Sequence, residues 1–178
     1  AGREIAVATT KGYTTQVVAL YMTALHFAAV RKTLTDKELE FYANELMKIP
    51  AHVEATLSVE KRIEEIAEKY TNKGNIFFIG RNTDFAAASE GALKLKEISY
   101  INCTALPAGE LKHGTIALIE DGTLVFALAT QNFLFEKMIS NIQEIKARGA
   151  NVIGIAKEGN TDIETQSSEV IYIPDCID

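Results

Sequence analysis

The sequence has few cysteines, few histidines and no excess of positive charge, and each shortage excludes a class of protein. Its two cysteines, Cys103 and Cys176, and its three histidines form no CxxC or HxxxH pair, so we expect neither a metal site nor a cofactor held by one. Two free thiols fit a reducing compartment, and we expect a cytoplasmic protein. The net charge of −6 argues against binding nucleic acid through bulk positive charge.

A secretory signal is also lacking, and only one stretch of the chain raises the question of a membrane. The chain starts without Met, and we expect it to be cut from a longer protein. Residues 12–30 carry no charge, and their number approaches the about 20 residues of a spanning helix. Polar side chains are spread through this stretch and Arg31 and Lys32 end it, which favours a buried helix in a soluble core.

What remains is an ordinary globular composition. The chain has 178 residues, of which 47% are hydrophobic and 24% are charged. This balance excludes a long disordered tail or a collagen-like fibre. The length suits one domain, or one domain with part of another.

The first seventy residues have helical patterns and contain no expected strand. Thr35 and Glu38 have the spacing of a capping box, which predicts a helix start at Asp36. Pro50 stands where a further helix can begin. The expected helices span residues 14–33, 36–48 and 51–70.

After residue 74, short apolar runs alternate with amphipathic segments. Helices are expected over residues 84–99 and 133–148. Such alternation predicts an α/β fold, a three-layer sandwich with a mostly parallel sheet. The expected strands are residues 75–80, 101–105, 123–129, 151–156 and 169–173.

One helix carries a charged pattern that could serve catalysis. Glu90, Lys94 and Glu97 stand at positions i, i+4 and i+7, so they share a helix face on which Lys94 can reach both carboxylates. An ionised Glu next to a sugar carbon can act as a general base. From spacing alone, a surface ladder of ion pairs is the more frequent explanation.

Two turns after expected strands offer further candidates. His113 lies in a charged turn bracketed by Gly109 and Gly114, where it could take and give a proton, or could simply bond its own turn. The turn at residues 80–82 follows the first strand at its carboxyl end, where ligands bind in such sheets. This turn could face a phosphate or could be a plain connection.

Three segments together resemble one enzyme family. They read EIAVATTKGYTTQ at residues 4–16, EGALKLKEISY at residues 90–100 and AGELKHG at residues 108–114. Their order and spacing resemble the isomerase half of the glutamine–fructose-6-phosphate aminotransferases (isomerizing), the glucosamine-6-phosphate synthases. The resemblance extends more weakly over nearly the whole chain.

The resemblance implies a fold and a domain organisation. The isomerase half of that family has two sugar-isomerase (SIS) subdomains, each a flavodoxin-like sandwich. Residues 1–48 resemble the end of the first subdomain, and residues 49–178 resemble the second without its C-terminal tail. The phosphate-binding loops, a Schiff-base lysine of the tail and the glutaminase half would lie outside this chain, so we expect the fragment to be inactive alone.

The resemblance also implies roles for individual residues. Glu97 resembles the base that moves a proton between C1 and C2 of the sugar, and Glu90 and Lys94 resemble its electrostatic partners. His113 resembles the residue that assists ring opening and reaches the neighbouring subunit, which implies a homodimer. Val7 and Thr9 resemble residues of a sugar-binding loop. The implied substrate is a sugar phosphate, and neither nucleic acid nor a membrane is implied as a partner.

Two other functions remain open. The chain could belong to another SIS enzyme, such as a sugar-phosphate deaminase or deglycase that works without a glutaminase half. It could also be a non-catalytic SIS module that senses sugar phosphates. Such a module has no need of Glu97 or His113, and both residues are present.

Overall fold

A computed structural model describes residues 2–3, 5, 7–71 and 74–178 of the chain. The chain divides into two compact units, Ala1–Glu54 and Ala55–Asp178. The first unit is helical and the second contains the sheet. The predicted subdomain boundary after residue 48 stays a prediction.

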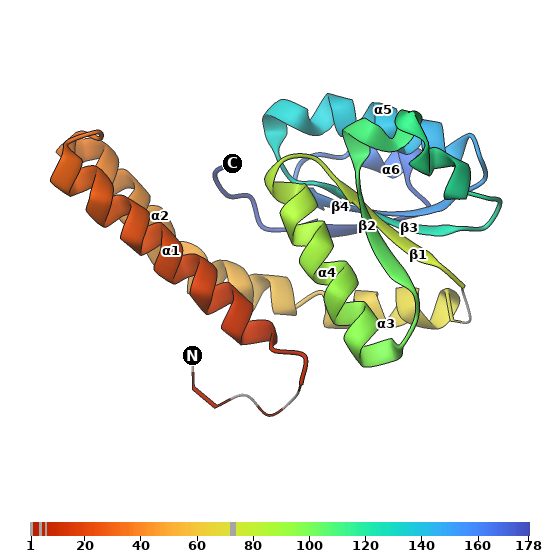
Figure 1. Cartoon of the computed structure of the whole chain (residues 1–178), viewed down its shortest axis with the longest axis horizontal. Coiled ribbons are helices and arrows are strands. Elements are labelled where there is room, and N and C mark those ends of the chain that lie inside the picture. The colour runs from red at the N-terminus through yellow and green to blue at the C-terminus, as the bar shows by residue number, and fades with distance from the viewer. Residues whose placement is uncertain (1, 4, 6, 72–73) are drawn as a thin grey trace. The chain divides into compact units, whose positions relative to one another are not determined.

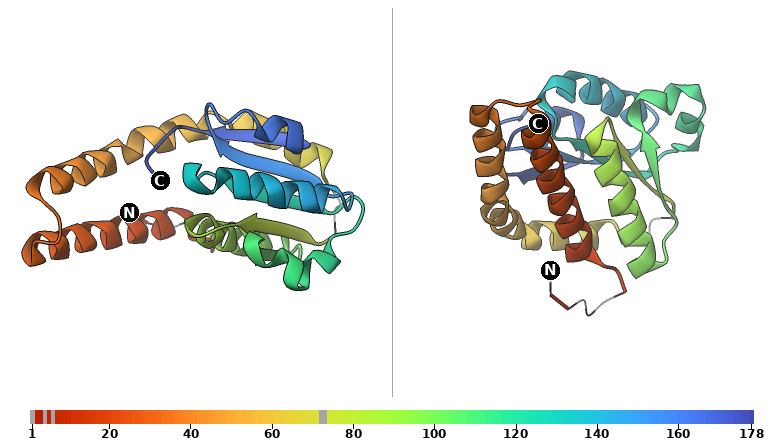
Figure 2. Two further views of the ribbon diagram at one scale, coloured as in Figure 1. Left: turned by 90° about the horizontal axis from the view of Figure 1, so that it is seen from above. Right: turned by 60° about the vertical axis from the view of Figure 1, so that its left-hand side comes forward.

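The first unit consists of two long helices. Helix α1 spans Thr10–Arg31 and helix α2 spans Asp36–Leu57, and Figures 1 and 2 show them running in opposite directions from the turn that joins them. The predicted capping box is confirmed: the Thr35 backbone N–H donates to Glu38 Oε2 at 2.7 Å, and the Glu38 N–H donates to Thr35 Oγ1 at 3.3 Å. These bonds satisfy backbone donors that the helix start leaves free.

Helix α1 differs from the expectation of a buried helix. Leu20 is 68% exposed and Phe27 is 59% exposed. Helix α2 contains no buried residue. A unit of two helices has too little surface to cover apolar side chains on every side. No described helix is long and apolar enough to span a membrane.

Pro50 does not start a helix, contrary to our expectation. It lies inside α2, which continues to Leu57. A proline removes one backbone hydrogen bond of a helix. The residues on both sides of Pro50 are nevertheless helical, so α2 tolerates this loss. The break comes instead at Ser58 and Val59, after which helix α3 spans Glu60–Lys69.

The second unit is built on a five-stranded sheet in which every pair of neighbouring strands is parallel. The strand order is β2-β1-β3-β4-β5, the flavodoxin-like order of a doubly wound sheet. All five predicted strands are present, with ends shifted by up to two residues. They are β1 (Ile76–Gly80), β2 (Cys103–Pro107), β3 (Leu124–Ala129), β4 (Asn151–Lys157) and β5 (Glu169–Ile173).

Helices cover both faces of this sheet, which confirms the three-layer sandwich (Figure 1). Helix α4 (Thr83–Ser99) and Ile66 of α3 pack on one face. Helix α5 (Phe135–Lys146), the short α6 (Ile163–Gln166) and the 3-10 helix η1 (Ala108–His113) pack on the other. Two further 3-10 turns, η2 (Thr115–Leu118) and η3 (Asn132–Leu134), complete the connections.

The central strands explain why apolar runs signalled the sheet. Every residue of β1 is buried, and β3 is buried except at Phe126. A strand with helices on both faces has no polar side, so its sequence is continuously apolar. Ile79 and Val125 are fully buried and belong to the core beneath α5. This core positions α4 and the loops at both ends of the strands.

Candidate active site

Helix α4 presents its small residues to the sheet, and this decides where its charges lie. It follows Gly80, where an added Cβ would come within 2.5 Å of the Asp84 backbone, so the tight entry requires glycine. Ala88 and Ala92 are buried against the sheet. An added Cβ on Gly91 would lie 3.2 Å from the Phe78 ring. The close approach of this face leaves the longer charged side chains on the flank of the helix.

Glu90, Lys94 and Glu97 come together on that flank, as their spacing predicts. The Lys94 ammonium lies 2.8 Å from Glu97 Oε2 and 3.6 Å from Glu90 Oε1. The side chains are 23%, 19% and 34% exposed, respectively, for Glu90, Lys94 and Glu97. The Glu97 hydrogen bond, together with the charges of Glu97 and Glu90, raises the pKa of Lys94 above its ordinary value despite opposing desolvation.

This arrangement can hold a carboxylate ready for proton transfer. Lys94 remains a cation near neutral pH, and it lies 2.8 Å from Glu97 and 3.6 Å from Glu90, so its positive charge faces both carboxylates. Glu97 is the most exposed member and can meet a ligand from solvent. Its other carboxylate oxygen, Oε1, has no hydrogen bond to a described residue. A carboxylate with one oxygen held and one oxygen free suits general base chemistry.

His113 is the last residue of η1 and lies at the surface. Its side chain is 74% exposed, and its Nε2 lies 3.9 Å from Oε2 of Glu110, which is 68% exposed. The neighbouring Lys112 forms a 2.9 Å ion pair with Glu144 of α5, which ties η1 to that helix. The imidazole is therefore displayed on an anchored turn and is open to solvent.

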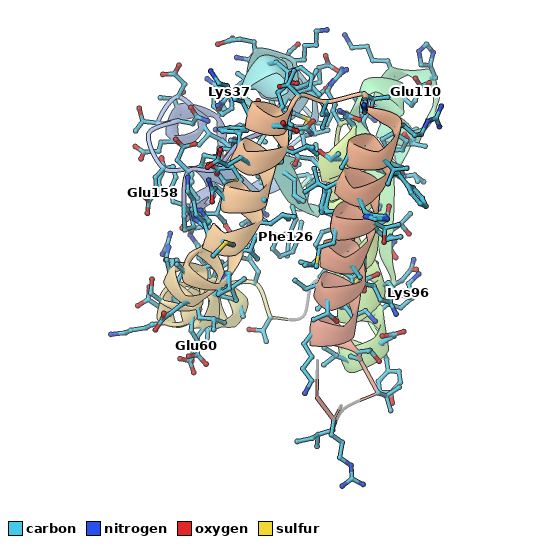
Figure 3. The ribbon with its side chains drawn as sticks, turned by 90° about the vertical axis from the view of Figure 1, so that its left-hand side faces the viewer. Lys37, Glu60, Lys96, Glu110, Phe126 and Glu158 are labelled. Carbon is cyan, nitrogen blue, oxygen red and sulfur yellow. The ribbon has the colours of Figure 1, made fainter. Side chains whose placement is uncertain are left out.

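The structure does not bring His113 to Glu97 within this chain. Helix α4 ends at Ser99 and leads into the start of β2, whereas His113 follows the end of β2. Figure 3 shows the corresponding separation of Lys96, near the end of α4, and Glu110 in η1. Glu97 thus lies toward the amino ends of the parallel strands, and His113 lies toward their carboxyl ends.

Val7 and Thr9 lie in the first unit, ahead of α1. Val7 is 93% exposed, and the Thr9 hydroxyl donates to the Val7 carbonyl oxygen at 3.2 Å. Thr9 occupies the N-cap position of α1 without a side-chain bond to the helix. Glu4 and Ala6 of the same motif lie outside the described residues. The predicted role of Val7 and Thr9 in sugar binding stays a prediction.

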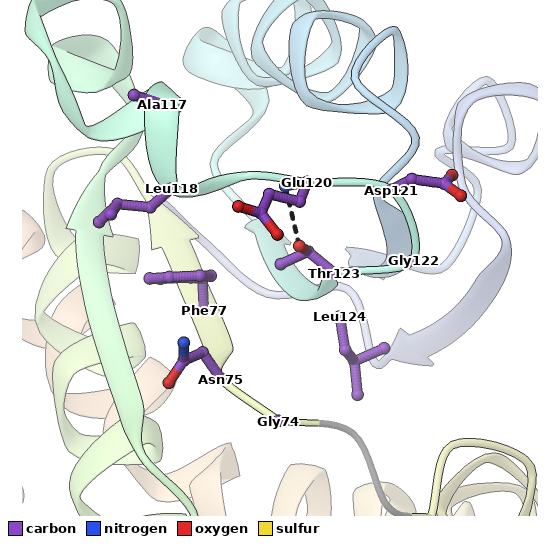
Figure 4. A pocket seen from close by; sticks show the side chains of 10 residues that line it. All are labelled: Gly74, Asn75, Phe77, Ala117, Leu118, Glu120, Asp121, Gly122, Thr123 and Leu124. Atoms are coloured by element: carbon purple, nitrogen blue, oxygen red, sulfur yellow. Dashed lines mark hydrogen bonds between the residues drawn. The ribbon is translucent and has the colours of Figure 1, made fainter.

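A pocket of about 430 Å³ lies at the amino edge of the sheet, where β1 and β3 begin (Figure 4). The Glu120 backbone N–H donates to Thr123 Oγ1 at 2.9 Å across its rim. None of the predicted site residues lines this pocket. The lining residues are Gly74, Asn75, Phe77, Ala117, Leu118, Glu120, Asp121, Gly122, Thr123 and Leu124.

A polar network at the carboxyl edge of the sheet was only partly foreseen. The sequence indicates the turn at residues 80–82 as a possible ligand site, but it does not indicate the residues that bond this turn, which come from distant segments of the chain. The Gln131 side chain donates to the Arg81 carbonyl oxygen at 2.8 Å and accepts from Asn82 Nδ2 at 3.1 Å. The buried Asp84 carboxylate accepts bonds from the Thr130 N–H at 2.9 Å and the Thr130 hydroxyl at 2.5 Å. Contacts across more than 45 residues leave no local sequence signal.

No group of three or more His, Cys, Asp or Glu side chains in the described part of the chain is arranged to hold a metal ion. Cys103 is buried and Cys176 is exposed, and neither forms a disulfide.

Comparison with protein families and curated proteins gives a consistent result. The SIS domain family model matches residues 69–175. A glutamine–fructose-6-phosphate aminotransferase (isomerizing) from Caldanaerobacter subterraneus is 53% identical over 99% of this chain and 29% of its own length. Its counterpart from Clostridium tetani is 52% identical over 98% of this chain and 29% of its length. The chain therefore spans about 29% of the curated relatives it matches.

Comparison with solved structures agrees. The C-terminal domain of glucosamine-fructose-6-phosphate aminotransferase from Francisella tularensis superposes with a TM-score of 0.92 and 39% sequence identity. The match covers 97% of this chain and 49% of that one.

Proposed function

The chain belongs to the SIS domain family, and we propose that it is the sugar-phosphate isomerase part of a glutamine–fructose-6-phosphate aminotransferase. In the proposed reaction, fructose 6-phosphate and glutamine-derived ammonia give glucosamine 6-phosphate. The observation that carries the proposal is the cluster of Glu90, Lys94 and Glu97 on one face of α4, within a chain about half identical to aminotransferases of that name.

Glu97 is the proton carrier of the proposed reaction. Converting a 2-ketose into a 2-amino aldose requires a proton to leave C1 and another to arrive at C2. A carboxylate can do both, because it takes the first proton and becomes the acid that returns it. The partly exposed carboxylate of Glu97, which Lys94 holds at 2.8 Å, supports this assignment.

The remaining candidates have supporting roles. Lys94 and Glu90 set the electrostatics around Glu97. His113 assists ring opening, and because it lies at the other edge of the sheet from Glu97, we propose that it serves the site of a neighbouring subunit in a homodimer. Val7 and Thr9 contribute to sugar binding. A glutaminase domain elsewhere in the full-length protein supplies ammonia.

Two other SIS functions are less well supported. A deaminase or deglycase would run the amine chemistry in the direction of removal, and a sensor would need no proton carrier. The two relatives that match nearly the whole of this chain at 52% and 53% identity carry the aminotransferase name. This name favours amine transfer over amine removal. The cluster around Lys94 favours an enzyme over a sensor.

An assay of the full-length protein tests the proposal. We expect glucosamine 6-phosphate to form from fructose 6-phosphate and glutamine. We expect no measurable conversion by the 178-residue chain alone, because orientation of the substrate supplies several kcal/mol of barrier lowering and the chain spans 29% of its relatives. Amine release from glucosamine 6-phosphate without synthesis would favour the deaminase instead, and robust turnover by the 178 residues would refute the expected division of labour.

A further inference from the structure

The carboxyl edge of the sheet has a topological switch point beside Arg81. In the order β2-β1-β3-β4-β5, the chain leaves β1 through α4 on one face, and leaves β3 through α5 on the other. Ligands of open α/β sheets bind outside the carboxyl ends of the strands at such a point. Arg81 directly follows the last residue of β1 and is partly buried there.

The Arg81 side chain is held in one position. Its Nε donates to Asn141 Oδ1 at 3.0 Å, and Asn141 of α5 is only 5% exposed. The guanidinium also lies against Gly109, where an added Cβ would come within 3.2 Å of Nη1. Contact with α5 on one side and η1 on the other fixes the plane of the guanidinium.

The backbone beside Arg81 is fixed as well. Asn82 adopts φ 48° and ψ −124°, an unusual conformation for a residue other than glycine. Gln131, 5% exposed, bonds both the Arg81 carbonyl oxygen and the Asn82 side chain. The buried side chains of Asn141 and Gln131 thus hold both the side chain and the backbone of this turn by hydrogen bonds.

Arg81 nevertheless lacks a charge partner. No described carboxylate forms an ion pair with it, and its Nη1 and Nη2 atoms make no hydrogen bond to a described residue. The nearby carboxylate of Asp84 is occupied by Thr130. By contrast, Lys157 at the end of β4 is neutralised by Asp178 at 2.5 Å. Lys157 is therefore paired with a carboxylate, whereas Arg81 forms no ion pair with a described residue.

We propose that Arg81 binds a phosphate group at this edge, in a site separate from the cluster around Lys94. The two Nη atoms offer a fork that matches two phosphate oxygens. The choice of phosphate over other anions rests on the proposed function, in which the substrate and product are sugar phosphates. The phosphate can belong to a sugar phosphate or be free phosphate, since both present the same oxygens.

A titration of the ¹⁵N-labelled 178-residue chain with inorganic phosphate tests the site. We expect saturable shifts of the backbone N–H signals of Asn82, Thr83 and Gly109. Arg81→Met should weaken binding on the order of tenfold or more, because a charged hydrogen-bond donor is removed. The matched control is Lys96→Met, which removes one exposed cation near the other end of α4 and should leave the affinity unchanged.

Two further measurements make the outcome decisive. If Arg81→Met loses its circular dichroism signal, Arg81→Lys takes its place, and it should bind more weakly because it keeps the charge but loses the fork. A parallel titration with glucose 6-phosphate distinguishes the sources: equal affinity indicates free phosphate, and tighter binding indicates a sugar phosphate. Shifts that do not saturate, or that are equal in the Arg81 variant, would overturn the site. Because no turnover is measured, this failure is distinct from failure of the proposed function.

Discussion

Lys94 and Glu97 form a 2.8 Å ion pair across one turn of α4, on a flank of the helix that the sheet leaves free. The same ammonium lies 3.6 Å from Glu90. One cation thus serves two carboxylates of a partly exposed face. The arrangement predicts that the chemistry of Glu97 depends on a residue that need not touch the substrate.

The first prediction concerns Lys94→Met in the full-length protein. Isomerisation of fructose 6-phosphate should fall, because Glu90 and Glu97 lose their shared cation and repel one another. The melting temperature should change little, because all three side chains are partly exposed. The loss should fall on kcat more than on KM, because Lys94 is assigned to the electrostatics around the proton carrier and not to sugar binding.

Lys96→Met is the matched control for that variant, because Lys96 is exposed on the same helix and makes no ion pair with a described residue. It should keep both kcat and KM. A Lys94→Met protein with an unchanged kcat would show that the cluster is only a surface ladder of ion pairs.

The second prediction concerns the attachment of α3 to the edge strand β5. Lys69 and Arg62 of α3 both pair with Glu169, and these bonds lower the pKa of Glu169 below its ordinary value against the effect of desolvation. A carboxyl whose pKa is depressed by folding stabilises the fold above its unfolded pKa, and this contribution is lost as pH falls through the folded pKa.

Glu169→Gln should therefore lower the melting temperature at pH 7, and the difference from the unaltered chain should shrink as the pH falls below about 4.5. Glu136→Gln, which alters an exposed carboxylate on α5, is the control. A difference in melting temperature that persists unchanged at acidic pH would argue against the ion pairs as its cause.

The third prediction separates the two thiols. Cys103 is 1% exposed in β2, and burial raises its pKa above the ordinary value in spite of an opposing effect of Lys96. Cys176 is exposed. Since the thiolate is the reactive form, Ellman's reagent should modify one thiol quickly and the other only on unfolding. Cys176→Ser should abolish the fast phase, and a fast phase that survives would mean that Cys103 is accessible.

Much of the fold could be predicted because its signals are local. The buried strands are continuously apolar, and the capping box at Thr35 and Glu38 lies within four residues. The prediction of a helix start at Pro50 was wrong. Proline is common at helix starts, but Pro50 lies inside α2. The attachment of α3 could not be foreseen, since Arg62 and Glu169 are 107 residues apart in sequence.

The candidate site divides in the same way. The i, i+4, i+7 spacing of Glu90, Lys94 and Glu97 predicts their shared face, because a helix converts spacing directly into proximity. The support of Arg81 by Asn141 joins residues 60 positions apart and depends on how α5 packs on the sheet. Tertiary packing of this kind has no counterpart in a local pattern.

The central claim, that Glu97 is the proton carrier, is tested most directly with Glu97→Gln in the full-length protein. The amide keeps the shape of the side chain but cannot take a proton, so conversion of fructose 6-phosphate to glucose 6-phosphate should fall about 10²- to 10⁴-fold. The dissociation constant for fructose 6-phosphate, measured by calorimetry on the same sample, should stay nearly unchanged. Full isomerisation by this variant would contradict the account.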